Sequence, residues 1–228
     1  MDVTVKKAFE EQLREKFQDL THKQTVFFVW LCAVRALPLM GVDRSLYHWK
    51  EEYRQKHTYD IFNALDIVYA YVFDIPFTTD IEFIYNSVCE SLKYDTTKIV
   101  AESTALAVKS AKEKFLSVDE IIACMGYINN TAYKNNMDFK DIWLNDIDCI
   151  KSNSLSSLNN DIKRYGVCWD NLRAHCFADM NCVYWIDLYI GIFKDVFQLD
   201  KEELKRRLIV PNEIQKRGAK AVADIIVT

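Results

Sequence analysis

The fold is decided by the run Val26-Phe27-Phe28-Val29-Trp30-Leu31-Cys32-Ala33-Val34-Arg35-Ala36-Leu37, which carries one charged residue. A helix that is apolar on every side is buried inside a protein rather than lying on its surface. Pro38 follows the run and interrupts helical hydrogen bonding. We therefore predict a central helix that ends near Pro38 and that is capped by Thr21 or Thr25.

Other segments extend this helical pattern in both directions. Residues 61–73 form a second run that is apolar all round and stops around Pro76. Residues 3–19 have apolar side chains at spacings of three and four, and residues 97–115 are rich in alanine, which lets helices approach closely. These segments predict two central helices and further helices packed around them.

The composition supports the same fold class. The 228 residues include only 5 glycines and 3 prolines, whereas strand-rich folds use turn-forming residues at many tight turns. We predict an all-α, compact multi-helix bundle of roughly 9–11 helices. A single domain over residues 1–228 is expected, with a candidate sub-boundary in the polar run 151–160.

Charge and hydropathy exclude several classes of partner. The net charge of −4 is spread along the chain, and the small basic clusters Lys205-Arg206-Arg207 and Lys216-Arg217 are expected to be solvated rather than to bind nucleic acid. The apolar run Val26–Val34 is shorter than the ~20 residues that span a bilayer, and the first residues lack the pattern of a signal peptide. We therefore expect a cytoplasmic protein that binds neither nucleic acid nor a membrane.

Motifs for metal or nucleotide chemistry are absent from the sequence. His175 and Cys176, together with Cys182, could in principle act as metal ligands, but they lack the paired spacing of zinc sites. With 5 glycines the chain has no phosphate-binding glycine-rich loop. No catalytic residue, metal or cofactor is predicted.

Single charges inside apolar helices are the most informative feature for a site. Arg35, Asp66 and Asp187 are each the only charged residue in an apolar run. Burial of an unpaired charge costs several kcal/mol, so each needs a partner or access to water. We expect Arg35 to lie within salt-bridge reach of Asp66 or Asp187. Asp187 has a polar stripe toward Lys194, which also predicts an exposed position for it.

Aromatic residues crowd the last third of the chain. Trp185, Tyr189 and Phe193 share one helical face, and Trp169 lies upstream. Such a face usually belongs to the core. If it is open in the monomer, these four residues become candidates for an interface.

The C-terminal part also carries spaced tryptophan and proline blocks. They are Trp169-x2-Leu172-Arg173, Trp185-Ile186-Asp187-x-Tyr189 and Ile209-Val210-Pro211-Asn212-Glu213-Ile214-x3-Gly218-x3-Val222. Together with Arg35-Ala36-Leu37-Pro38-Leu39, these blocks resemble a poorly characterised group of bacterial all-helical proteins. In that group an aromatic residue is typical at the position of Gln215. The front half is loosely similar to helical immunity proteins of bacterial toxin systems. The resemblance implies no catalytic residues.

Two hypotheses of function follow. The first is a protein-binding factor of the immunity or regulatory type, of bacterial or phage origin, with another protein as its partner. The alternative is a small-ligand binder or enzyme with a polar pocket around Arg35 and Asp66. The sequence leaves the oligomeric state open, including a homo-oligomer.

Overall fold

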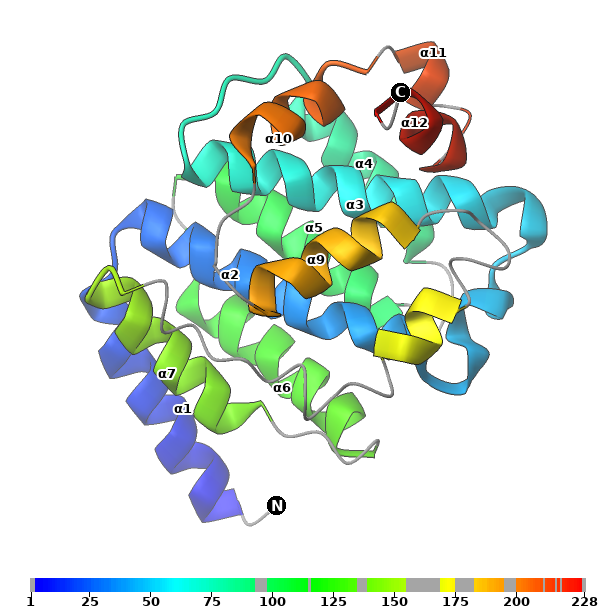
Figure 1. Ribbon diagram of the computed structural model, residues 1–228. Coiled ribbons are helices and arrows are strands. Elements are labelled where there is room, and N and C mark those ends of the chain that lie inside the picture. Colours follow the sequence, from blue (N-terminus) through cyan, green and yellow to red (C-terminus); the bar gives the residue numbers. More distant parts are fainter. Residues whose placement is uncertain are drawn as a thin grey trace.

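The computed structural model describes residues 3–92, 98–114, 116–134, 139–154, 169–174, 183–194, 200–210, 212–215, 217 and 219–226. Within these ranges the chain is mostly helical and has no strands (Figure 1), which confirms the predicted all-α class. The number of helices is slightly higher than predicted. One reason is that the apolar helix continues past its expected end as a 3-10 helix.

The bounds of the elements follow the chain in order. The N-terminal half contains α1 (Val3–Gln18), α2 (His22–Ala36), the 3-10 helix η1 (Leu37–His48), α3 (Glu51–Val72), α4 (Ile81–Ser91) and α5 (Lys98–Lys112). The C-terminal half contains α6 (Val118–Lys134), α7 (Lys140–Lys151), α9 (Val183–Lys194), α10 (Lys201–Leu208), α11 (Asn212–Gln215) and α12 (Ala219–Ile226). Residues 169–174 are also helical.

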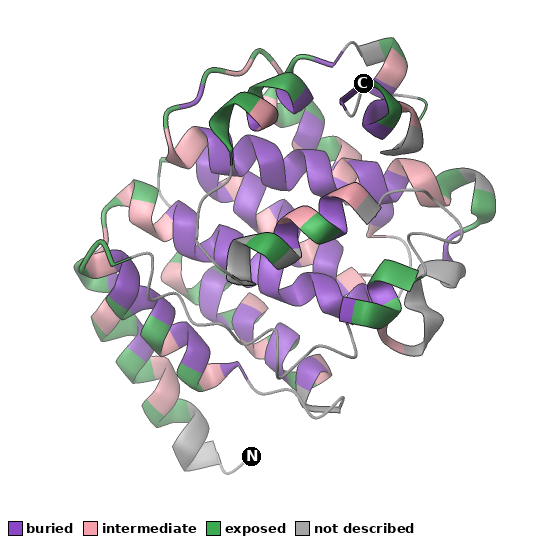
Figure 2. Cartoon of the chain, in the orientation of Figure 1, coloured by how far each residue is buried: buried purple, intermediate pink, exposed green. Residues whose placement is uncertain are grey.

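Helices α2, α3 and α5 form the centre of the bundle, and Figure 2 shows them largely buried. Every residue of α2 from Val26 to Ala36 is buried. Helix α5 packs against it with the small residues Ala101, Ala105 and Ala107, all of which are buried. The predicted close approach of the alanine-rich helix is therefore present.

The start of α2 follows the sequence prediction. Thr21 is the N-cap, and its side chain and that of Gln24 form a capping box. The stretch His22–Val42 is long and apolar enough to cross a membrane by length and composition alone, but 89% of its most apolar window is buried among the other helices. Burial of this kind is typical of a core helix.

Helix α3 is one continuous helix that begins at Glu51, ahead of the apolar run 61–73 that the sequence predicted to be helical. His57 and Thr58 lie just before the apolar run and are buried, and their packing keeps this polar stretch helical. The helix ends at Val72, Asp74 just beyond it has a left-handed φ of 55°, and the Ile75 N–H donates to the Ala70 carbonyl over 2.9 Å. This turn directs residues 75–80 across the end of the bundle.

The C-terminal helices lie on one side of this centre. In Figure 1, α9 crosses in front of α2 and α3, and α10 and α12 lie against α3. The candidate boundary at 151–160 begins where α7 ends, at Lys151, and Asn153 just beyond it has a φ of 54°. Residues 155–160 lie outside the described ranges, and a single domain over 1–228 stays a prediction.

Candidate functional site

Arg35 forms a buried, bidentate ion pair with Asp146 of α7. Its Nε and one terminal nitrogen donate to the two carboxylate oxygens over 2.8 and 2.7 Å. The side chains are 5% and 0% exposed. The predicted partners, Asp66 and Asp187, were therefore wrong. The pair satisfies the buried guanidinium and fixes the contact between α2 and α7.

Asp66 has a separate arginine partner. Arg207 of α10 donates to both of its carboxylate oxygens over 2.7 and 3.0 Å, and the Tyr189 hydroxyl donates over 3.0 Å. Burial lowers the pKa of the Arg207 guanidinium, but the Asp66 carboxylate outweighs burial and the net pKa is raised. The expected solvation of Lys205-Arg206-Arg207 is wrong for Arg207, which is 2% exposed.

A signal for this burial exists in the sequence. Leu204, Arg207 and Leu208 share one face of α10 at a spacing of three and four residues, and all three are buried. Arg207 also donates to the Tyr184 hydroxyl over 3.2 Å, and Tyr184 contacts Glu203. Burial followed by the hydrogen bond to Glu203 raises the pKa of Tyr184 to about 12. The network therefore ties α3, α9 and α10 together.

Asp187 lies at the surface, in agreement with its polar stripe. It pairs with Arg173 over 2.7 Å, and the two side chains are 49% and 53% exposed. The side chain of Lys194 lies outside the described residues. Asp187 is therefore not part of a buried charge cluster.

The aromatic interface candidates are placed in the core. Trp169, Trp185 and Tyr189 are buried, and the rings of Trp185 and Phe62 stack with centroids 5.8 Å apart. The condition for an interface, an open face in the monomer, is not met by these three residues. The side chain of Phe193 lies outside the described residues.

Neither Arg35 nor Asp66 lines the cavities described below, and the bidentate pairs occupy their charged groups. Within the described ranges, no group of three or more His, Cys, Asp or Glu side chains is arranged to hold a metal ion. His175, Cys176 and Cys182 lie outside those ranges.

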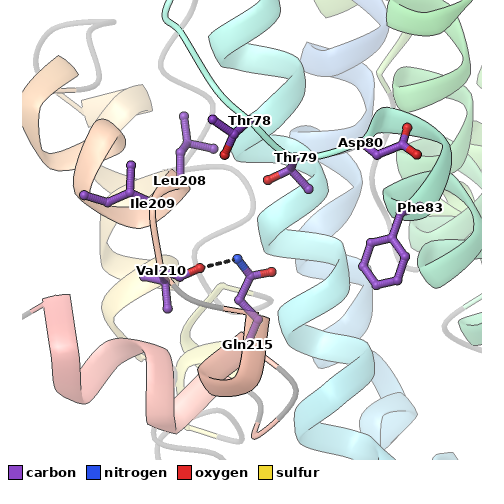
Figure 3. A pocket seen from close by; sticks show the side chains of 8 residues that line it. All are labelled: Thr78, Thr79, Asp80, Phe83, Leu208, Ile209, Val210 and Gln215. Atoms are coloured by element: carbon purple, nitrogen blue, oxygen red, sulfur yellow. Dashed lines mark hydrogen bonds between the residues drawn. The ribbon is translucent and has the colours of Figure 1, made fainter.

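A groove of about 570 Å³ opens at one end of the bundle. Figure 3 shows its two sides, which come from segments far apart in the chain. One side is the connection from α3 to α4 together with the start of α4, and the other is the end of α10 with α11. The lining residues are Thr78, Thr79, Asp80, Phe83, Leu208, Ile209, Val210 and Gln215.

Large apolar side chains stand exposed on both sides of this groove. Phe83 of α4 is 54% exposed and Ile209 is 71% exposed. Gln215 stabilises the C-terminal side by donating from Nε2 to the Val210 carbonyl over 2.6 Å. Asp80 starts α4 as its N-cap and accepts from the Glu82 N–H over 2.9 Å. The groove thus combines exposed apolar side chains with polar ones on fixed helix ends.

A smaller cavity of about 150 Å³ shares Phe83 and Gln215 with the groove. Its wall on α3 includes Lys56 and Asp60, and Lys56 Nζ donates to Asp60 and to Glu90 over 2.9 Å each. Burial raises the pKa of Asp60 to about 6, although Lys56 opposes this. One lysine is therefore shared between two carboxylates.

Sequence reasoning missed the groove. Phe83 lies in α4 and Ile209 directly follows α10, and a single exposed apolar residue at either place gives no signal by itself. Only the packing of α10 onto α3 brings the two residues to one opening.

Comparisons with protein-family models, with curated proteins and with solved structures found no significant match to this chain.

Proposed function

We propose that this chain is a protein-binding factor of the regulatory or immunity type, and that it binds its partner in the groove between α4 and the end of α10. The observation that carries the proposal is the pair Phe83 and Ile209. Both are more than half exposed, and they line one opening from opposite sides. Apolar residues gathered around a groove are typical anchors for a partner side chain.

The occupant that fits this groove is an extended segment of a partner protein that carries an apolar residue beside a lysine or arginine. Thr78 and Thr79 lie in non-helical backbone and offer hydroxyls along one side. Asp80 at the groove supplies negative charge. Complementary charge gives an interface specificity and fast association.

A bacterial or phage setting in the cytoplasm is part of this proposal. It is supported by the resemblance of residues 35–39 and of the C-terminal blocks to the bacterial helical group, and by the burial of His22–Val42 inside the bundle. The small-ligand alternative around Arg35 and Asp66 loses support because both charges are held in bidentate pairs.

The test is quantitative capture of partners with matched variants in the cells that naturally express the chain. We expect the double variant Phe83→Ser, Ile209→Ser to reduce recovery of a partner protein at least tenfold. The matched control is Tyr127→Ser, Ile225→Ser, because these side chains are 48% and 46% exposed and do not line the groove. It should recover the partner as well as wild type does.

Two outcomes would contradict this proposal. One is equal recovery by wild type and the groove variant. The other is recovery of nothing except a second, differently tagged copy of this chain, which would make the groove an interface between copies.

The charge of the groove is tested by Asp80→Asn. Asparagine is also a good N-cap, so the start of α4 is kept while the negative charge is removed. We expect partner binding several-fold weaker and less dependent on salt than that of wild type, measured by capture at two ionic strengths. Unchanged affinity and salt dependence would refute the basic-segment part of the proposal.

A further inference from the structure

The cavity of about 150 Å³ beside the groove is built on one face of α3. Four lining residues of this helix are related by spacings of three and four, so they lie on the same face. They are Lys56, Tyr59, Asp60 and Asn63. The remaining walls are Phe83, Ile84 and Ser87 of α4 and Gln215 of α11. The cavity holds the end of one side chain, since drug-sized ligands fill ~300–1,000 Å³.

Asn63 brings a buried amide to this cavity. It lies well inside α3, lines the cavity and is only 6% exposed. Its side chain forms no hydrogen bond with the part of the chain that the structure describes. Unlike the indole nitrogen of Trp143, the amide is not enclosed by protein atoms, so a group in the cavity can reach it. A buried polar group without a partner costs about 1–3 kcal/mol and calls for a physical explanation.

Gln215 supplies an acceptor from a different helix. Its Nε2 donates to the Val210 carbonyl over 2.6 Å, which fixes the orientation of the amide. Its Oε1 accepts no hydrogen bond from the described residues. Gln215 is 9% exposed and lines both the cavity and the groove (Figure 3). The cavity therefore offers donor and acceptor groups from Asn63 together with an acceptor from Gln215.

The charged residues of the cavity wall neutralise each other. Lys56 Nζ donates to Asp60 over 2.9 Å, and both residues line the cavity. A charged group that entered the cavity would lose its hydration and find this cation and this anion already paired. The group that fits is therefore neutral and carries a hydrogen-bond donor next to an acceptor.

We propose that this cavity binds the primary carboxamide of a glutamine or asparagine side chain in the partner segment, which rests on the proposed binding of that segment in the groove. A primary carboxamide has one carbonyl oxygen and two N–H donors. It can pair with the Asn63 amide through two hydrogen bonds and keep one N–H for the Gln215 oxygen. Phe83 lines both openings, so an apolar residue of the same segment can lie in the groove.

The first test uses the side-chain NH2 resonances of the 15N-labelled full chain, with Asn63→Leu to assign the Asn63 signals. Titration with isovaleramide should shift these signals saturably. Isovalerate has the same carbon skeleton but no N–H donor. It should bind about tenfold more weakly or worse, because it loses a hydrogen bond and its charge must be dehydrated. No saturable shift with isovaleramide, or equal binding of amide and acid, would overturn the proposal.

Matched substitutions locate the binding. Asn63→Leu should weaken isovaleramide at least about threefold, measured on the Gln215 signals, and should not lower stability because the amide has no partner to lose. Asn63→Ser makes the same comparison if Asn63→Leu does not fold. Asn86→Leu is the control, since Asn86 is exposed on α4 and does not line the cavity. Wild-type affinity in both Asn63 variants would contradict binding at this amide.

Capture of the partner separates this proposal from the proposed function. Asn63→Leu should lower recovery at least about threefold, whereas Asn86→Leu should recover the partner as wild type does. Loss of the partner in Phe83→Ser, Ile209→Ser but full recovery in Asn63→Leu would leave the groove in place and rule out a carboxamide from the partner. Equal recovery by wild type and the groove variant would overturn both proposals, and isovaleramide binding would then assign the cavity to a free small amide.

Discussion

Two buried arginine–aspartate pairs have nearly the same geometry but connect different parts of the molecule. The pair of Arg35 and Asp146 joins α2 to α7, with nitrogen to oxygen distances of 2.7 and 2.8 Å. The pair of Arg207 and Asp66 joins α10 to α3, with distances of 2.7 and 3.0 Å, and adds the Tyr189 hydroxyl.

The two pairs lie at different depths in the molecule. Arg35 and Asp146 belong to helices packed together in the body of the bundle. Arg207 lies in the eight-residue helix α10, and it also contacts Glu203, which is 24% exposed. The first pair therefore stabilises the bundle as a whole. The second holds in place the segment that ends in the groove residues Leu208–Val210.

The largest effect is expected from Asp146→Asn. This change removes the carboxylate charge and leaves the guanidinium of Arg35 buried without it, which should lower the free energy of unfolding by about 3–5 kcal/mol. Urea unfolding of wild type and variant measures this. Asp148→Asn is the control, since Asp148 is 58% exposed and should change stability little. A loss below about 1 kcal/mol for Asp146→Asn would contradict the structural role of the pair.

Arg207→Met should cost less, about 2–3 kcal/mol, because Asp66 keeps its hydrogen bond from Tyr189. Thermal unfolding should show the loss of stability for Arg207→Met. Arg206→Met should change stability little, because the neighbouring Arg206 side chain is exposed. If both variants behave alike, the buried contact with Asp66 does not stabilise the chain.

Asp60 extends the comparison to a buried carboxylate that shares a lysine instead of having its own arginine. Because its pKa in the folded chain is about 6, above the usual 3.8, the protonated form is favoured by folding. The contribution of the protonated Asp60 carboxyl to the free energy of unfolding is complete below pH 3.8 and is lost as the pH rises through about 6. Lys56 and Glu90 are the charged groups bonded in this cluster.

The variant Asp60→Asn removes that titration. Relative to wild type, it should gain about 2–3 kcal/mol of stability between pH 4 and pH 7. Urea unfolding at a series of pH values measures the difference. A difference between variant and wild type that stays constant with pH, or that falls as the pH rises, would show that Asp60 titrates normally.

The smallest effect is expected at the exposed pair of Arg173 and Asp187. Exposed ion pairs contribute about 0–1 kcal/mol. Arg173→Ala should therefore lower the unfolding free energy by no more than about 0.5 kcal/mol, and less at high salt. A loss as large as that of Arg207→Met would remove the distinction between buried and exposed pairs.

The sequence predicted the class of fold because α2 is apolar all round and α5 is rich in small residues. It also identified Arg35 and Asp66 as charges that need partners. It could not identify those partners, because Asp146 and Arg207 lie in helices with several charged residues, where one more charge is not conspicuous. Residues distant in sequence meet only through packing, and the groove between Phe83 and Ile209 arises in the same way.

Amide hydrogen exchange tests most directly the claim that the Asp66 pair holds the groove segment while the Arg35 pair holds the bundle. For Arg207→Met, we expect faster amide exchange in residues 201–226 and unchanged protection in α2 and α5. For Asp146→Asn, we expect faster exchange in residues 201–226 and also in α2 and α5. Uniformly faster exchange in Arg207→Met, or no change in residues 201–226, would contradict the claim.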